Sequence, residues 1–288
     1  MLIRYCILAI LVMAGLMAEA QKKIALVVGI SDYPENSGFR PIHGDNDAKV
    51  INYSLDKQGF IVTQILNSDA TARNIRNALE TVANNSQSGD YVYLHFSCHG
   101  QPVEDQEPFD EDDNWDEALV TYNAKINYQS GVYEGENHIL DDELYRYFNR
   151  IRDNIGSQGF LCVVIDACHS GNSSRDENDD EKTIRGVNDG FSISGKSFVP
   201  VINRSGSFKI ESRQNAGDII IFEACRSYQN NYEILVDGNH FGPLSYYVAK
   251  TLDSYKISKT MDWVYRIKSH MDGDRQIINQ NMVYEKSF

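Results

Sequence analysis

The chain alternates short apolar runs with segments whose apolar residues recur at helical spacing. Runs rich in β-branched residues predict strands at 24–28, 61–66, 91–96, 161–165 and 219–222. Apolar residues three to four positions apart predict helices at 45–59, 71–82, 141–151, 243–252 and 260–271. Strands that are apolar on both faces and alternate with helices are typical of a mostly parallel sheet between two helix layers, so the sequence predicts an α/β fold.

The first twenty residues have the pattern of a secretory signal peptide. Arg4 precedes an apolar run from Cys6 to Ala18, and Ala18-Glu19-Ala20 provides small residues at a cleavage site. The run is shorter than the ~20 apolar residues that span a bilayer, and no later segment is apolar enough to anchor the chain. We therefore expect a cleaved segment 1–20, a single domain at 21–288, export to the periplasm or the medium, and no membrane anchor.

Charge and cysteine content narrow the range of partners. Acidic residues number 41 against 27 basic ones, and the net charge of −14 opposes binding to a nucleic-acid backbone. Three of the four cysteines beyond residue 20 lie in or at the ends of predicted strands, in a domain large enough to need no disulfides. The four are Cys98, Cys162, Cys168 and Cys225. The sequence therefore favours free thiols and argues against a nucleic-acid partner.

Two long segments interrupt the alternation. Residues 101–137 begin with a dense acidic run and are interpreted as an acidic insertion loop. Residues 171–217 are rich in Ser, Asn, Asp and Gly and are interpreted as a mobile loop. This second loop also carries basic residues, namely Arg175, Lys182, Arg185, Lys196 and Arg204.

Two candidate catalytic side chains follow neighbouring predicted strands. His99 and Gly100 come after the third strand, and Cys168 comes after the fourth. Ligand sites in parallel sheets lie at the carboxyl ends of the strands. A thiol and an imidazole there could carry out acyl transfer, with backbone N–H groups beside a glycine to hold the oxyanion. Taken alone, the pair is weak evidence, and a core cysteine with a structural histidine is the default interpretation.

The local sequences around the pair favour the catalytic interpretation. Tyr93-Leu94-His95-Phe96-Ser97-Cys98-His99-Gly100 and Asp166-Ala167-Cys168-His169-Ser170-Gly171 resemble the paired motifs of metacaspases, which are caspase-like cysteine peptidases. Segments 28–33, 46–48, 115–120, 139–144 and 241–245 resemble further parts of that family. The resemblance implies a caspase-like three-layer α/β/α sandwich around a mostly parallel six-stranded sheet. It also implies a cysteine endopeptidase of the bacterial metacaspase type.

The resemblance assigns a role to each matching position. It implies that Cys168 is the nucleophile, that His99 is the general acid and base, and that the backbone N–H groups of Gly100 and Cys168 form the oxyanion hole. His95 and His169 are competing imidazoles, of which the first is expected to be packed in the core. Cys225 is a weaker candidate nucleophile, because it follows His99 by far more residues than caspases show between these two groups.

The same resemblance implies specificity for basic residues. Asp47, Ser97 and Asp166 match the family's pocket for a basic side chain, and carboxylates pair well with a guanidinium or an ammonium group. We therefore expect peptide or protein substrates that are cleaved after Arg or Lys, and self-processing within 171–217 as a hypothesis. In the alternative, Asp47 caps its helix and Asp166 orders its own turn.

No cofactor is expected to be required for the chemistry, but calcium is a candidate activator. Carboxylate oxygens suit this hard cation, and the resemblance implies ligands at Asp116, Asp141 and Asp142. The fourth family position aligns with Arg175, so Asp176 beside it is the candidate. In the alternative, Asp141 and Asp142 are helix-start carboxylates favoured by the helix dipole.

Two other functions remain open from the sequence. One is a catalytically silent caspase-like binding module, and the other is a thiol amidase of different specificity that would not need the acidic pocket. The resemblance favours a monomer.

Overall fold

The structure, a computed structural model, describes residues 21–106, 114–168, 183–187, 189–202 and 206–288. Its centre is a six-stranded sheet with the strand order β11-β8-β7-β3-β1-β2. The strands are β1 (Lys23–Gly29), β2 (Ile61–Leu66), β3 (Tyr91–Ser97), β7 (Phe160–Asp166), β8 (Asp218–Glu223) and β11 (Val283–Lys286). The first five pair in parallel, and β11 runs antiparallel to β8. This confirms the predicted mostly parallel sheet. The apolar runs in the sequence predicted every strand of this sheet except β11.

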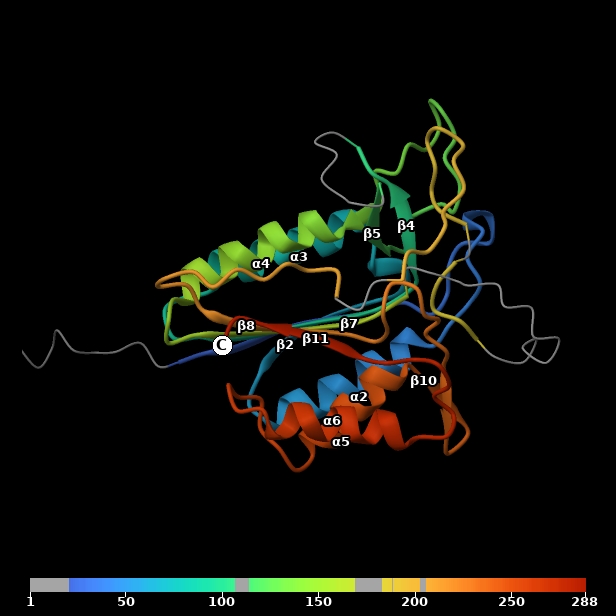
Figure 1. The fold of residues 1–288 in the computed structure, drawn as a ribbon. Helices are drawn as coiled ribbons and strands as arrows, with labels where there is room; N and C mark the ends of the chain where they lie inside the picture. Colours follow the sequence, from blue (N-terminus) through green and yellow to red (C-terminus); the bar gives the residue numbers. More distant parts are fainter. Residues whose placement is uncertain (1–20, 107–113, 169–182, 188, 203–205) are drawn as a thin grey trace, which may run out of the picture.

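Helices cover both faces of this sheet (Figure 1). On one side lie α3 (Ala72–Asn85) and α4 (Asp141–Ile155), and on the other lie α2 (Gly44–Lys57), α5 (Pro243–Leu252) and α6 (Asp262–Gly273). Two short 3₁₀ helices are η1 (Glu35–Ser37) and η2 (Asn67–Asp69). Thr71 caps α3 by accepting a hydrogen bond from the backbone N–H of Asn74 (3.3 Å). The three-layer α/β/α expectation is therefore confirmed.

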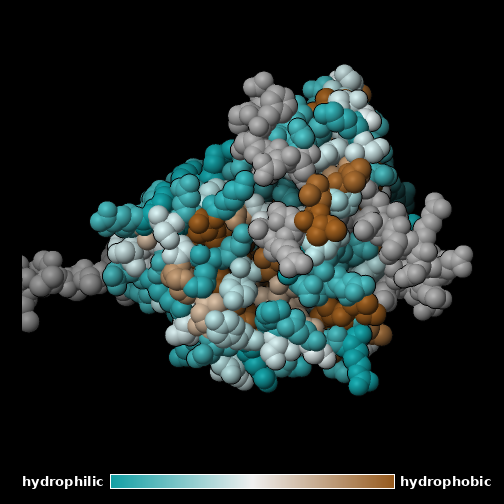
Figure 2. All heavy atoms as spheres, in the orientation of Figure 1, coloured by the Kyte–Doolittle hydropathy of each residue, from teal (hydrophilic) through white to brown (hydrophobic). Residues whose placement is uncertain are grey.

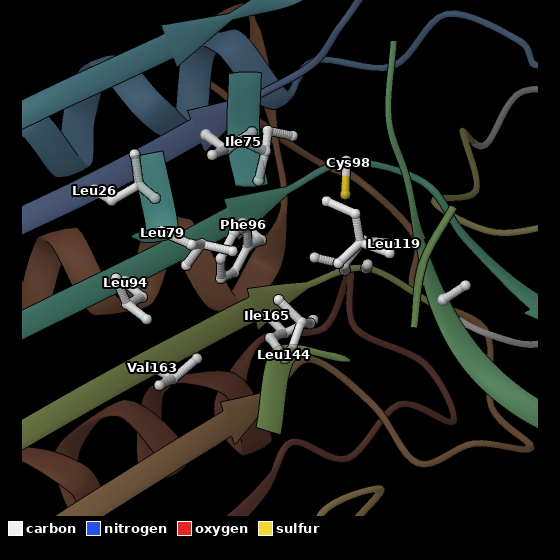
Figure 3. Packing of buried hydrophobic residues seen from close by; sticks show 14 of the residues in the cluster. Leu26, Ile75, Leu79, Leu94, Phe96, Cys98, Leu119, Leu144, Val163 and Ile165 are labelled. Carbon is white, nitrogen blue, oxygen red and sulfur yellow. The ribbon is translucent and has the colours of Figure 1, made fainter. Parts of the chain in front are cut away.

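Two apolar clusters hold the layers together, because successive side chains of a strand point to opposite faces. On β1, Leu26 and Val28 pack toward α3 and α4, whereas Ala25 and Val27 pack toward α2 and α5. Figure 3 shows the first cluster, in which side chains of β3 and β7 meet those of α3 and α4. Both faces of the central strands are therefore dry, and the polar site lies at the strand ends.

The segment 101–137, expected to be an insertion loop, contains regular structure. Antiparallel strands β4 (Gly100–Glu104), β5 (Trp115–Val120) and β6 (His138–Leu140) form a second sheet. The pattern missed it because Pro102, Glu104 and Asp116 are residue types that strands disfavour. A two-stranded hairpin of β9 (Ile234–Val236) and β10 (Asn239–Phe241) lies near the amino end of α2. The loop interpretation of 101–137 is corrected accordingly.

The surface is mainly hydrophilic, with small separated apolar patches on the face that Figure 2 shows. Within the described part of the chain, no helix is both long enough and apolar enough to cross a bilayer. The segment 1–20 lies outside the described residues.

Candidate active site

His99 and Cys168 lie together at the carboxyl edge of the central sheet. Strands β3 and β7 pair in register through Ser97 and Asp166, and each candidate follows its strand by two residues. Both residues are buried. The topology therefore brings together two side chains that are 69 positions apart in the sequence.

The imidazole of His99 is oriented by a backbone carbonyl. Its Nε2 lies 2.8 Å from the carbonyl oxygen of Arg40, and a carbonyl can only accept, so the ring proton is on Nε2. Nδ1 therefore carries the lone pair, and this buried atom has no hydrogen-bond partner among the described residues. Burial lowers the pKa of His99 to about 4. At neutral pH the ring is uncharged, with one nitrogen ready to take a proton.

The two predicted oxyanion-hole donors converge on one oxygen atom of this chain. The N–H of Cys168 donates to the carbonyl of Arg185 at 3.0 Å, and the N–H of Gly100 donates to the same oxygen at 3.2 Å. Paired donors at this distance are the arrangement that stabilises a developing oxyanion. The carbonyl carbon of the Arg185–Gly186 peptide bond therefore lies beside the candidate nucleophile.

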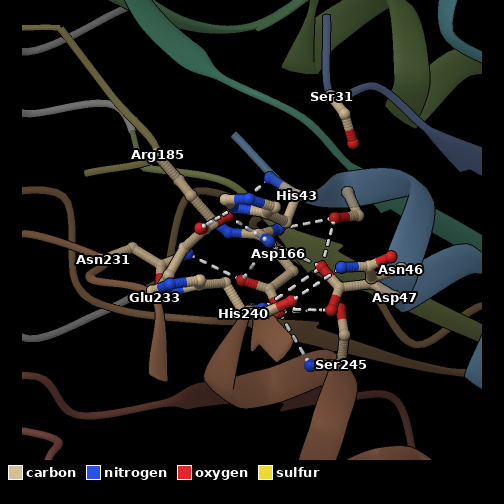
Figure 4. A network of polar contacts seen from close by, with 12 residues as sticks. Ser31, His43, Asn46, Asp47, Asp166, Arg185, Asn231, Glu233, His240 and Ser245 are labelled. Atoms are coloured by element: carbon tan, nitrogen blue, oxygen red, sulfur yellow. Dashed lines mark hydrogen bonds and ion pairs between the residues drawn. The ribbon is translucent and has the colours of Figure 1, made fainter. Parts of the chain in front are cut away.

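The side chain of Arg185 fills the predicted pocket for basic residues (Figure 4). Its guanidinium is fully buried and lies 2.7 Å from Asp47 Oδ2 and 2.8 Å from Glu233 Oε1. One terminal nitrogen donates to Ser97 Oγ at 2.5 Å and lies 4.0 Å from Asp166 Oδ1. The three residues expected to bind a basic side chain therefore do surround one, and Glu233 joins them.

Other groups hold the two pocket aspartates in place. Ser97 Oγ donates to Asp47 Oδ2 at 2.7 Å, so the Asp47 side chain faces the pocket and not the first turn of its own helix. Asp166 accepts from Asn231 Nδ2 at 2.7 Å and from both the N–H and the hydroxyl of Ser245, each at 2.7 Å. Asp166 therefore bonds to distant segments and does not merely order its own turn.

The pocket has an excess of negative charge. Burial raises the pKa of Asp47 to about 8, although the guanidinium of Arg185 opposes this shift. Burial alone would lower the pKa of Arg185, but the nearby carboxylates Asp47, Asp166 and Glu233 hold it above its ordinary value. A cation is therefore strongly favoured here, because several buried carboxyl groups share one guanidinium.

The backbone before Arg185 is held as a bound peptide would be. Ile184 forms an antiparallel bridge with Tyr232. The N–H of Arg185 donates to the carbonyl of Asn231, and the N–H of Glu233 donates to the carbonyl of Thr183, both at 2.9 Å. Adding an extended segment to an existing edge in this way is a common mode of peptide recognition.

The segment after Arg185 is also packed. Gly186 bridges Gly100, and Phe191, which is buried, bridges Val103 of β4. The described parts of the loop 171–217 thus include residues fixed against the site.

Several groups in and around this site carried no recognisable signal in the sequence. The orienting group at Arg40 is a backbone carbonyl, which any residue provides. Glu233 and Asn231 lie just before β9 in no motif, and only the tertiary structure brings them to Arg185. Arg185 itself stood in the sequence as one of several basic residues of its loop.

The other candidate catalytic residues that the structure describes are His95 and Cys225. His95 is buried in β3 and its Nε2 lies 3.0 Å from Ser245 Oγ, which fits the expected core role. His169 lies outside the described residues. Cys225 is buried, and its thiol donates to the carbonyl of Gln229, which also accepts from Cys168.

Three of the four predicted calcium ligands lie within the described residues. Asp116 lies in β5, and Asp141 and Asp142 begin α4. Asp176 lies outside the described residues. Within the described residues, the ligand atoms of His43, Glu233 and His240 all lie within 4.8 Å of one another and could hold a metal ion.

The fold and this site define an α/β protein with a thiol, an imidazole and a pair of oxyanion donors at one sheet edge. The family model "Caspase domain" matches residues 22–277, so the chain belongs to the caspase domain family. It is also similar to metacaspases at low identity, and this family membership supports a cysteine peptidase.

Named relatives and one solved structure give the extent of that similarity. Metacaspase-1B of Aspergillus fumigatus is 22% identical over 70% of this chain and 53% of its own length. Metacaspase-1 of Cryptococcus neoformans is 22% identical over 88% of this chain and 60% of its own length. The chain thus spans little more than half of these relatives. The crystal structure of a Geobacter sulfurreducens protein matches with a TM-score of 0.63 at 19% identity, over 92% of this chain and 93% of that one.

Proposed function

We propose that this protein is a cysteine endopeptidase that cleaves after Arg or Lys, and that its first substrate is its own Arg185–Gly186 bond. One observation carries the proposal. The carbonyl oxygen of Arg185 lies between the N–H groups of Cys168 and Gly100 while its guanidinium fills the acidic pocket. A segment bound only for stability would not need to place both its carbonyl oxygen between two N–H donors and its side chain in the acidic pocket at the same residue.

The reaction follows from these positions. His99 Nδ1 takes the proton of the Cys168 thiol, and the sulfur attacks the carbonyl carbon of Arg185. The N–H groups of Gly100 and Cys168 stabilise the oxyanion, and Nδ1–H then protonates the departing amine of Gly186. This departure breaks the bond and leaves a new amino terminus at Gly186. Water then hydrolyses the thioester between Cys168 and Arg185, which leaves a carboxyl terminus at Arg185 and restores the thiol.

The resting arrangement is latent. The thiol of Cys168 donates to the carbonyl of Gln229 at 2.8 Å, so its sulfur must turn away from that oxygen before it attacks. Until Arg185 leaves the pocket, no other basic side chain can enter it. The uncut chain is therefore a self-blocked enzyme, and cleavage followed by release of Arg185 opens the site.

The test is to incubate the purified protein and to determine new termini by mass spectrometry. We expect a fragment beginning at Gly186 from the wild type and none from Cys168→Ala. Arg185→Lys should still be cut, whereas Arg185→Ala should not. Lys196→Ala is the matched control, because Lys196 is an exposed basic residue of the same loop that pairs with Glu104.

Peptide hydrolysis by the processed protein tests the specificity in trans. We expect turnover of peptides ending in Arg or Lys and none of those ending in Asp. A folded protein that neither cuts itself nor hydrolyses any of these peptides would refute the proposal and favour the silent binding module.

Export, calcium stimulation and a monomeric state complete the proposal. The charged and apolar pattern of residues 1–20 supports export, and detection of the chain starting at Gln21 outside the cytoplasm tests it. In support of calcium, β5, which contains Asp116, pairs with β6, and α4 begins with Asp141 and Asp142 directly after β6. Loss of peptide turnover with a chelator and its return with calcium test this, and sedimentation tests the monomer.

A further inference from the structure

A second thiol lies beside the proposed nucleophile, and the proposed reaction does not use it. Cys168 and Cys225 each follow a strand by two residues, and their strands β7 and β8 are parallel neighbours. Both thiols donate to the same oxygen, the carbonyl of Gln229, at 2.8 Å and 3.3 Å. Cys225 also interacts electrostatically with Cys168. The two sulfur atoms are thus neighbours at one acceptor.

The placement of the two thiols suits a covalent bond between them. Their sulfur atoms lie 2.8 Å and 3.3 Å from one oxygen atom, and the strands that precede them are hydrogen-bonded neighbours. A disulfide requires its two cysteines to lie on adjacent backbone segments in this way. Moreover, the shared acceptor is a carbonyl at the end of the short turn that follows Cys225. Both side chains are buried, so a bond between them would expose no new apolar surface. Small rotations about the side-chain bonds are the main change that linkage requires.

The two thiols would have different roles in forming such a bond. The contact with Cys168 and burial raise the pKa of Cys225, so this thiol stays protonated. Cys168 and His99 follow the neighbouring strands β7 and β3, and in the proposed reaction His99 takes the proton of Cys168. We therefore expect an oxidant to react first with Cys168, which can form a thiolate. Cys225 is then placed to react with the oxidised sulfur of Cys168.

We propose that Cys168 and Cys225 form a reversible disulfide that switches the peptidase off under oxidising conditions. This inference rests on the proposed role of Cys168 as the nucleophile. It gives a use to Cys225 and a reason for a free thiol pair at the ends of β7 and β8.

The oxidant is a peroxide, and the step balances with hydrogen peroxide. The thiolate of Cys168 attacks one peroxide oxygen, which expels hydroxide and leaves a sulfenic acid. The sulfur of Cys225 then attacks the sulfenic sulfur, loses its proton and displaces hydroxide, so that two thiols and one peroxide give one disulfide and two waters. A dithiol reductant reverses the bond by thiol–disulfide exchange.

Peroxide treatment followed by mapping of the cysteines tests the switch. The wild-type protein is treated with hydrogen peroxide, free thiols are alkylated, and the unreduced digest is analysed by mass spectrometry. We expect a linked pair of peptides carrying Cys168 and Cys225, which disappears after dithiothreitol. Peptide hydrolysis should be lost with the same time course and return on reduction.

Two variants complete the design. In Cys225→Ser the linked pair cannot form, so peroxide should drive Cys168 to a sulfinic acid and the loss of activity should not be reversed by dithiothreitol. Cys162→Ala is the matched control, because Cys162 is a buried thiol within β7, and it should behave as the wild type.

The linked peptides are detected without any need for activity. If they form in a protein that hydrolyses nothing, the proposed function fails and the disulfide stands. If oxidation gives no Cys168–Cys225 link, or if Cys225→Ser recovers as fully as the wild type, the switch is refuted whatever the activity.

Discussion

Replacement of Asp47 by asparagine is a sharp test of the acidic pocket. Asp47 Oδ2 lies 2.7 Å from a terminal nitrogen of Arg185, and neither side chain is exposed to solvent. Asparagine has nearly the same size, so Asp47→Asn removes the charge and leaves the packing. Asp45→Asn is the matched control, because Asp45 lies in the first turn of the same helix but contacts Ser31 and Lys49.

The expected loss can be worked out from the contact that is removed. A hydrogen bond to a charged group contributes about 1.5–3 kcal/mol, and about 1.4 kcal/mol corresponds to a tenfold change. For a peptide ending in Arg, kcat/KM of Asp47→Asn should therefore fall by about 10- to 100-fold. The contact of the guanidinium with Glu233 remains, so the loss should be partial.

The loss should also depend on pH. Burial raises the pKa of Asp47 to about 8, so this carboxyl group is mostly neutral below that pH and charged above it. The ion pair with a substrate arginine is then complete only on the alkaline side. Hence kcat/KM of the wild type should rise toward alkaline pH, and Asp47→Asn should lose more at about pH 9 than at about pH 6.5.

The assay is fluorogenic peptide hydrolysis by the processed protein across this pH range. Asp45→Asn should match the wild type throughout. A value of kcat/KM for Asp47→Asn within about twofold of the wild type at about pH 9 would refute the pocket, because the removed charge would then contribute nothing to catalysis.

Two further predictions concern other groups. A Cβ added at Gly186 would lie 2.5 Å from the carbonyl oxygen of Cys168 and 3.1 Å from the Cβ of Cys168. Gly186→Ala should therefore slow self-cleavage at least about tenfold. An unchanged rate of fragment formation in a gel time course would contradict the bound geometry. Burial and mutual repulsion raise the pKa of Glu223 to about 8, and burial raises that of Glu285 to about 7. A carboxyl group whose pKa is raised by folding disfavours the fold once it ionises. The melting temperature should therefore fall as pH rises from about 5 to about 8, and Glu285→Gln should flatten that slope. Equal slopes in the two proteins would count against the buried pair.

The amino-acid sequence already indicated the framework and the candidate catalytic side chains. Apolar runs such as 24–28 and 161–165 are dry on both faces, and this pattern is local, so it can be read without knowledge of distant contacts. The motifs that contain His99 and Cys168 follow such runs directly. Because parallel strands end at one edge, their juxtaposition follows from topology alone.

Other elements depended on neighbours that no local pattern reveals. Strand β11 is a short edge strand whose pairing with β8 is decided by the end of the chain folding back. Strands β4 and β5 contain proline and acidic residues, and they pair only because they lie beside each other in space. The hydrophobic alternation that identifies strands is weak in all three.

The content of the pocket was decided by the tertiary structure alone. The sequence indicated an acidic pocket from Asp47, Ser97 and Asp166, and it indicated a loop with several basic residues. It could not select Arg185 among them, because the selection depends on a match between one guanidinium and carboxylates from α2, β7 and the segment before β9. The backbone N–H groups that hold its carbonyl carry no side-chain identity, so only the folded chain determines where they converge.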